Sequence, residues 1–335
     1  MVHTETKTFD RRPAAANWIK KRERDLAQPG ALDAAQKKDP SLSDVIDQYI
    51  KESRKDIGRT KAQVLRAIKA APIGGMECSK IDSAAITRFA QGLGVQPQTV
   101  GNYLAHLASI FAIARPAWGY PLDQTAMDDA RKVAKKLGVT SRSIARNRRP
   151  TMAELDLLMD HFGKIRAKRV DSTPMQAITA FAIYSTRRLE EMCRITWKDL
   201  DEVGSRVMVR DLKHPGEKIG NDVWCDLPPE AMRIIQAQPK RGDRIFPVSS
   251  DAVSAAFTRA AKFLEIEDLH LHDMRHEGAS RLFEMGLSIP RVAAVTGHRS
   301  WQSLKRYTHL RHDGDRFADW KWLDVVAPPE ASAED

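Results

Sequence analysis

The sequence predicts a mainly α-helical protein that also contains one small antiparallel β-sheet. Apolar residues recur at helical spacing over most of the chain, as at Leu104, Leu107 and Phe111. Strand-like alternation replaces this spacing in two short runs, 205–212 and 221–227, on either side of a Pro-Gly turn. The length of 335 residues suits two domains of ordinary size.

Composition and charge narrow the class of protein further. The net charge is +10, and the basic excess lies in the first half of the chain and in one short connector. The three cysteines are far apart in the sequence, so neither a disulfide framework nor a thiolate metal site is expected. The chain has no long apolar run and no apolar N-terminal signal region, which favours a cytoplasmic protein without a membrane partner.

Residues 41–140 are expected to form a small bundle of about five helices, after an N-terminal extension over residues 1–40. Each expected helix ends at a glycine or a proline, residues that commonly end helices. The last helix carries three basic residues on one polar face. These candidates for DNA contacts are Lys132, Lys135 and Lys136.

The connector between the two domains is expected at residues 141–150, SRSIARNRRP, which include four arginines and no acidic residue. Cations in a linker can lie along a phosphate backbone, where each neutralised phosphate releases counterions and adds affinity without reading sequence. A solvated linker without DNA contacts is the alternative. The candidate contacts are Arg142, Arg146, Arg148 and Arg149.

Residues 151–311 are expected to form the second domain. Thr151 and Glu154 have the spacing of a capping box, which marks the start of its first helix. The two strand-like runs follow later in this domain, and the pattern after residue 228 is helical again. The small sheet is therefore expected within the second domain.

The tail, residues 312–335, is expected to contain a C-terminal helix and an acidic end. Phe317, Trp320 and Leu323 have helical spacing and form an apolar stripe. Such a stripe can pack on its own domain or dock on a neighbouring protomer, and the sequence leaves both alternatives open.

The second domain contains an ordered set of cationic, imidazole and phenolic side chains. In chain order they are Arg188 with Glu191, Lys213, His272 with Arg275, His298 and Tyr307. A tyrosine hydroxyl has a pKa of about 10 and must lose its proton to attack, which neighbouring cations favour. Two guanidinium groups can hold the non-bridging oxygens of a phosphodiester as charge develops there. A covalent phosphotyrosine can then form without a metal.

This set resembles the catalytic residues of the tyrosine recombinase, or phage integrase, family. The family's motifs are an arginine in a first box, a hairpin lysine, a His-x-x-Arg pair, a His or Trp after glycine, and a tyrosine about nine residues later. The six positions match in this order, and the resemblance covers about residues 41–310.

The first box departs from the family's usual Thr-Gly-x-Arg, because Thr186 stands where glycine is usual. Two arginines here each precede a glutamate by three residues, and alone this spacing is more typical of a surface ion pair. The family's later apolar, Trp and Asp positions match only if Arg188 is the catalytic arginine. Arg187 is then a neighbour expected to contact DNA.

The resemblance implies a helical core-binding (SAM-like) domain followed by a tyrosine-recombinase catalytic domain. It also implies a site-specific recombinase that needs no cofactor or metal and acts through a 3′-phosphotyrosine intermediate and a Holliday junction. The implied roles are Tyr307 as nucleophile, Arg188 and Arg275 as phosphate ligands, Lys213 as general acid, His272 and His298 as aids to proton transfer and phosphate stabilisation, and Glu191 as an orienting group.

The implied partners are double-stranded DNA recombination sites, with two protomers per site and a homotetramer on DNA. The protein would be nucleoid-associated when bound. The resemblance also allows for accessory DNA-bending or directionality proteins. Residues 1–40 resemble the segment beside an arm-type DNA-binding module, which is expected to be absent or vestigial.

Three other interpretations stay open on the sequence alone. His270, His272 and His276 could be zinc ligands, although no motif such as HExxH is present. A non-catalytic DNA-binding regulator would explain the basic half of the chain, but not the ordered set that ends at Tyr307. A type IB topoisomerase uses related chemistry, although two domains joined by a linker favour recombination.

Overall fold

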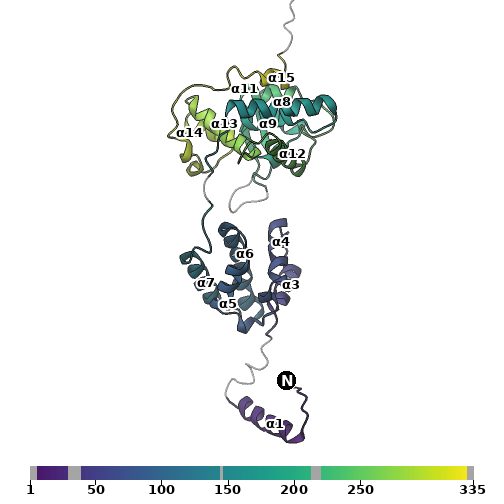
Figure 1. Ribbon diagram of the computed structural model, residues 1–335, viewed down its shortest axis with the longest axis vertical. Coiled ribbons are helices and arrows are strands. Elements are labelled where there is room, and N and C mark those ends of the chain that lie inside the picture. The colour runs from purple at the N-terminus through teal and green to yellow at the C-terminus, as the bar shows by residue number, and fades with distance from the viewer. Residues whose placement is uncertain (1–5, 29–38, 144–145, 213–219, 330–335) are drawn as a thin grey trace, which may run out of the picture. The chain divides into compact units, whose positions relative to one another are not determined.

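The computed structural model describes residues 6–28, 39–143, 146–212 and 220–329 (Figure 1). Its internal contacts divide the chain into two compact units, Met1–Ala145 and Arg146–Asp335. The residues predicted as a connector, 141–150, are therefore divided between the units, and Arg146 is the first residue of the second. Lys213 and the turn of the predicted hairpin lie outside the described residues.

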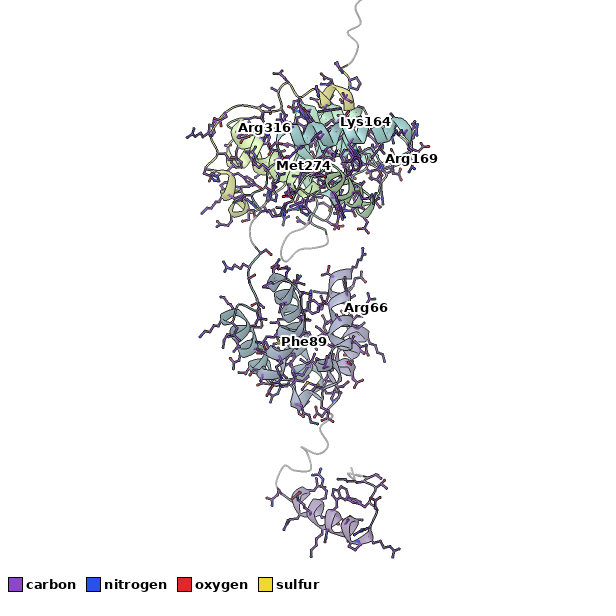
Figure 2. The ribbon with its side chains drawn as sticks, viewed as in Figure 1. Arg66, Phe89, Lys164, Arg169, Met274 and Arg316 are labelled. Carbon is purple, nitrogen blue, oxygen red and sulfur yellow. The ribbon has the colours of Figure 1, made fainter. Side chains whose placement is uncertain are left out.

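The first unit contains the predicted bundle, whose main core lies around one long helix. Leu104, Leu107 and Phe111 of that helix are buried at the predicted spacing, and Phe89 packs against the same core (Figure 2). A capping box between Ser41 and Asp44 begins the bundle. The helices are α1 (Arg12–Leu26), α3 (Leu42–Glu52), α4 (Arg59–Ala70), α5 (Ser83–Gly92), α6 (Pro97–Trp118) and α7 (Gln124–Lys136), with short 3-10 turns at Pro72–Gly75 and Cys78–Lys80.

The second unit surrounds a helix, α9, in which every residue except Gln176 is buried. Helices α8, α11, α12, α13 and α15 all pack against it. The helices are α8 (Met152–Lys168), α9 (Met175–Ser185), α10 (Leu189–Met192), α11 (Pro229–Gln236), α12 (Ser250–Phe263), α13 (Leu271–Glu284), α14 (Ile289–Thr296) and α15 (Trp322–Val326), with 3-10 turns at Trp197–Asp199, Trp301–Ser303 and Lys305–Tyr307. None of the helices in the described part of the chain is long and apolar enough to cross a membrane.

The small antiparallel sheet of the second unit contains the two predicted strands and one more. Strand β2 (Arg206–Val209) pairs with β3 (Val223–Asp226), with Val207 opposite Cys225. The additional strand is β1 (Leu200–Asp201), which pairs with the outer side of β2. Two residues are too few to show an alternating pattern, so the sequence did not reveal β1.

The tail packs on its own unit in this structure. Phe317 and Trp320 are buried, and their rings meet edge to face at 5.3 Å beside Tyr184 of α9. Their stripe is not part of a longer helix, because the described tail forms turns up to the five-residue helix α15. In this arrangement Phe317 and Trp320 are therefore not free to dock on a neighbouring protomer.

Candidate active site

The site begins where α9 ends. Thr186, the next residue, adopts a left-handed backbone conformation with φ 55° and ψ 22°. A residue with a side chain is uncommon in this region, and the usual cost is about 1 kcal/mol. Thr186 thus takes up the kind of backbone turn that glycine forms most easily, and it is fully buried. The turn directs the two arginines that follow into different surroundings.

Arg188 is half-buried and faces Glu191 one helical turn later. Its Nη1 atom donates to Oε1 of Glu191 at 2.7 Å, and its backbone N–H donates to Oε2 at 3.0 Å. The carboxylate of Glu191 is buried. Burial alone would raise the pKa of Glu191, but Arg187, Arg275 and Arg188 together lower it below its usual value. Glu191 is therefore ionised and orients Arg188.

Arg275 lies on α13 and is fixed by backbone oxygens on two sides. It donates through Nη1 to the oxygen of Thr186 and through Nη2 to the oxygen of Thr296 at 3.1 Å. Burial, Arg187 and Arg188 lower the pKa of Arg275 to about 9, which still leaves it charged at neutral pH. A fixed, desolvated cation of this kind interacts strongly with an anion brought close to it.

His298 follows Gly297, which ends α14 in a left-handed conformation with φ 72°. Its Nδ1 atom lies 2.7 Å from Oγ1 of Thr296, and its Nε2 atom lies 3.4 Å from Nη2 of Arg275. A guanidinium can only donate, so Nε2 must accept and Nδ1 carries the proton. Burial, Arg275 and Arg188 lower the pKa of His298 to about 3, so the ring is neutral.

His272 lies one helical turn before Arg275 on α13 and reaches solvent. Loss of hydration, Arg275 and Arg188 lower its pKa even though its side chain remains exposed. His298 contacts Arg275 directly, and His272 precedes Arg275 by one turn of α13. Arg275 and Arg188 both lower the pKa values of His272 and His298, in agreement with this arrangement. Within the described residues, the structure therefore brings together Arg188, Arg275, His272 and His298, with Glu191 beneath them.

Tyr307 ends a 3-10 turn, Lys305–Tyr307, and is 8% exposed. Its ring stacks on Phe283 of α13, with centroids 6.0 Å apart. Its hydroxyl is hydrogen-bonded to Nδ1 of His276. Burial raises the pKa of the Tyr307 phenol, and Arg306 and Arg275 offset part of this effect. The hydroxyl thus lies beside the cationic cluster but bonds to a neutral imidazole.

The sequence indicates His276 only as a possible metal ligand and does not predict it as a partner of the tyrosine. The available signal was its spacing, since His276 follows His272 by four residues and shares its helical face. The two rings meet edge to face at 4.9 Å. Across the residues that the structure describes, no group of three His, Cys, Asp or Glu side chains is placed to hold a metal ion.

Arg187 differs from the expectation of a DNA contact. Its side chain is 1% exposed, and Nη2 donates to the backbone oxygen of Val295. Its Nη1 atom lies 3.8 Å from Glu191. The left-handed turn at Thr186 sends Arg187 inward, so its guanidinium is enclosed and does not face solvent.

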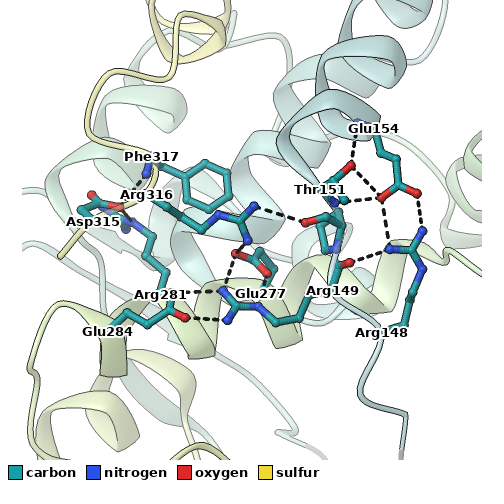
Figure 3. Close-up of polar contacts among 11 residues, drawn as sticks. Arg148, Arg149, Thr151, Glu154, Glu277, Arg281, Glu284, Asp315, Arg316 and Phe317 are labelled. Atoms are coloured by element: carbon teal, nitrogen blue, oxygen red, sulfur yellow. Dashed lines mark hydrogen bonds and ion pairs between the residues drawn. The ribbon is translucent and has the colours of Figure 1, made fainter. Parts of the chain in front are cut away.

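Three of the four connector arginines that were predicted as candidate DNA contacts form ion pairs within the second unit. Arg148 pairs with Glu154, the residue of the capping box with Thr151 (Figure 3). Arg149 pairs with Glu277 at 2.7 Å and with Glu284 at 2.5 Å, both on α13. Glu277 and Glu284 lie more than a hundred residues from Arg149 in the chain, so local sequence could not reveal these two pairs.

Arg146 is paired in the same way. It contacts Asp273 at 3.0 Å and Asp268 at 2.7 Å. In the first unit, Lys132, Lys135 and Arg142 line one surface hollow of about 880 Å³, and all three are exposed. Lys132 also pairs with Asp129 at 3.0 Å. Lys136, also on α7, is exposed but does not line this hollow.

Comparison with known proteins identifies the family. The sequence profile of the Phage integrase family matches residues 149–313. A shufflon-specific DNA recombinase of Escherichia coli is 30% identical over 286 residues, which are 81% of this chain and 69% of that protein. The tyrosine recombinase XerC of Corynebacterium glutamicum is 31% identical over 145 residues, which are 38% of this chain and 44% of that protein.

Solved structures show the same fold. A lambda integrase dimer bound to a core site has a TM-score of 0.65 at 18% identity, over 92% of this chain and 88% of that one. A lambda integrase tetramer bound to a Holliday junction has a TM-score of 0.63 at 19% identity, over 87% of this chain and 88% of that one. The family match and the similarity to the shufflon-specific recombinase show that the chain belongs to the phage integrase family and is a tyrosine recombinase.

Proposed function

We propose that this recombinase cleaves and rejoins DNA at specific sites by transferring a phosphodiester onto Tyr307. The observation that supports this most directly is the cluster of two fixed guanidinium groups and two imidazoles beside the phenol. Arg188 is oriented by Glu191, and Arg275 by backbone oxygens, so neither must reorganise when a phosphate arrives. Their positive charges would stabilise the charge that develops on the non-bridging oxygens.

In the proposed step, the Tyr307 oxygen forms a bond to phosphorus while the bond from phosphorus to the 5′ oxygen breaks. The phenol loses its proton to a neighbouring base or to water, and Lys213 gives a proton to the departing 5′ oxygen. His272 is the more accessible base, because it reaches solvent, whereas His298 supports phosphate stabilisation by accepting from Arg275 and so holding that guanidinium in place. Attack by a 5′ hydroxyl from another strand reverses the step and rejoins the DNA.

Strand exchange between two DNA sites needs four such steps, and we infer a dimer on each site and a tetramer on the Holliday junction. Lambda integrase, which shares this fold, forms these assemblies in its solved structures. The exposed cations of the first unit, Lys132, Lys135, Lys136 and Arg142, are proposed to contact DNA phosphates. The ion-paired arginines of the connector are not needed for that role.

The proposal is tested with Tyr307→Phe and with nicked DNA duplexes that trap a covalent adduct. The variant should bind its DNA but form no adduct, because it lacks the attacking oxygen. Tyr184→Phe is the matched control, since Tyr184 is also a buried tyrosine of the second unit and should still form the adduct. Adduct formation by Tyr307→Phe at the rate of the natural protein would overturn the assignment of the nucleophile.

A further inference from the structure

The nucleophile's segment is held by two contacts that the transfer reaction does not require. The first is the hydrogen bond between the Tyr307 hydroxyl and Nδ1 of His276. His276 and Phe283 lie seven residues apart on the same face of α13, so the hydroxyl and the ring of Tyr307 both rest on this helix. With 8% of its surface exposed, Tyr307 must move to reach a DNA phosphate.

The second contact links the residue before the nucleophile to the start of the second unit. Nη2 of Arg306 donates to the backbone oxygen of Arg146 and to Oδ1 of Asn147, the latter at 2.8 Å. Arg146 is in turn held by Asp273, whose carboxylate is buried next to His272 on α13. The connector, α13 and the tyrosine segment are thus joined by a continuous set of hydrogen bonds.

The chemistry of the first contact favours an unreactive phenol. Burial, His272 and Arg306 lower the pKa of His276 to about 4, whereas burial raises the pKa of Tyr307. The proton therefore stays on the phenol, and His276 acts as an acceptor and not as a base. A hydrogen bond donated by a neutral phenol stabilises its protonated form.

We propose that His276 is a positioning residue which withholds the nucleophile before DNA is engaged, and that Arg306 and the connector complete this latch. The inference rests on Tyr307 being the nucleophile. A phosphate oxygen is a stronger acceptor for a guanidinium than an amide oxygen. DNA phosphates that reach the connector therefore compete for Arg306, which releases the segment and lets the hydroxyl leave His276.

The latch is tested first without DNA, by amide hydrogen exchange of peptides that cover residues 304–310. His276→Ala and Arg306→Ala should each speed exchange there about fivefold, the size expected for loss of one net hydrogen bond. His276→Gln keeps an acceptor and should restore slow exchange. Combining His276→Ala with Tyr307→Phe should add nothing to either change alone, since both remove the same bond.

Unchanged exchange in His276→Ala, or equally fast exchange in His276→Gln, would overturn the latch. His161→Ala is the matched control, because His161 is a partly buried histidine of the same unit whose ring packs at a tilt against Phe263, and it should leave residues 304–310 unaffected. This measurement needs no cleavage, so its result is independent of whether Tyr307 is the nucleophile.

The second test is the rate of covalent attachment to nicked DNA in a single turnover. A released nucleophile should attach about fivefold faster in His276→Ala than in the natural protein. A tenfold slower rate in His276→Ala would identify His276 as part of the chemistry and would overturn the latch. Absence of adduct in the natural protein would instead count against the proposed function and leave the exchange result standing.

Discussion

Arg187 and Arg188 are neighbours in the chain but have opposite surroundings. Arg188 is half-buried and keeps part of its guanidinium accessible for an anion, whereas Arg187 is enclosed among backbone groups beside Glu191 and Gly297. Thr186 turns the backbone just before the pair, and the two consecutive side chains then lie in different surroundings. One arginine is therefore available to a substrate, and the other supports the shape of the site.

At this scale we predict that Arg187→Met lowers the free energy of unfolding by about 2–4 kcal/mol, because Val295 loses a buried donor and Glu191 loses a neighbouring charge. Urea unfolding of the two proteins measures the difference. Arg194→Met is the control, since Arg194 is exposed, and its effect should stay below about 0.5 kcal/mol. Equal effects of the two substitutions would contradict the supporting role of Arg187.

At the scale of elements, α13 carries most of the site. It supplies Arg275, His272 and His276, and it packs directly on the end of α9. Gly278 makes this approach possible, because a Cβ atom at that position would overlap the backbone oxygen of Ile183. The distance between the two helices sets the hydrogen bond from Arg275 to Thr186.

We predict that Gly278→Ala destabilises the protein by about 1–3 kcal/mol, because overpacking outweighs the gain in helix propensity. It should also slow adduct formation at least tenfold, since Arg275 moves away from Thr186. Gly101→Ala serves as the control, because its added Cβ meets open space within α6 and should not destabilise the protein. Thermal unfolding together with adduct assays measures both effects, and normal activity in Gly278→Ala would contradict this account.

At the scale of the second unit as a whole, buried charges join its first residues, its central helices and its tail. Glu277 of α13 receives Arg149 from the connector and Arg316 from the tail, the latter at 2.9 Å (Figure 3). Arg281 of the same helix pairs with Glu230 and with Asp315 of the tail. The stability of the unit thus depends on carboxylates that stay ionised and on histidines that stay neutral.

The pH dependence of stability follows from these groups. The pKa values of His276 and His298 are lowered in the folded state to about 4 and about 3, so between these values and about 6.5 the unfolded chain binds more protons. Stability is therefore complete above about pH 6.5 and falls on acidification, with a slope that approaches about 1.4 kcal/mol per pH unit for each histidine. Below the pH range in which carboxylates usually titrate, Glu191 and Asp315 add to the loss of stability, because their pKa values are also lowered in the folded state.

Urea unfolding at pH 7, 6 and 5 measures this slope. His298→Gln should reduce it by the contribution of one histidine, because glutamine has no proton to gain in the unfolded chain. His312→Gln is the control, since His312 lies in an exposed part of the tail. An unchanged slope in His298→Gln would show that this ring is not held neutral by its surroundings.

The sequence by itself determined the helical class, the capping box at Thr151 and the order of the residues in the site. Each depends on neighbours within a few positions, where periodicity and capping chemistry act. Only the tertiary structure decided that Arg187 is enclosed, that Arg149 binds α13, and that the Tyr307 hydroxyl rests on His276. These partners are brought together by packing around α9, and the balance between burial and charge at each one depends on groups that are distant in the chain.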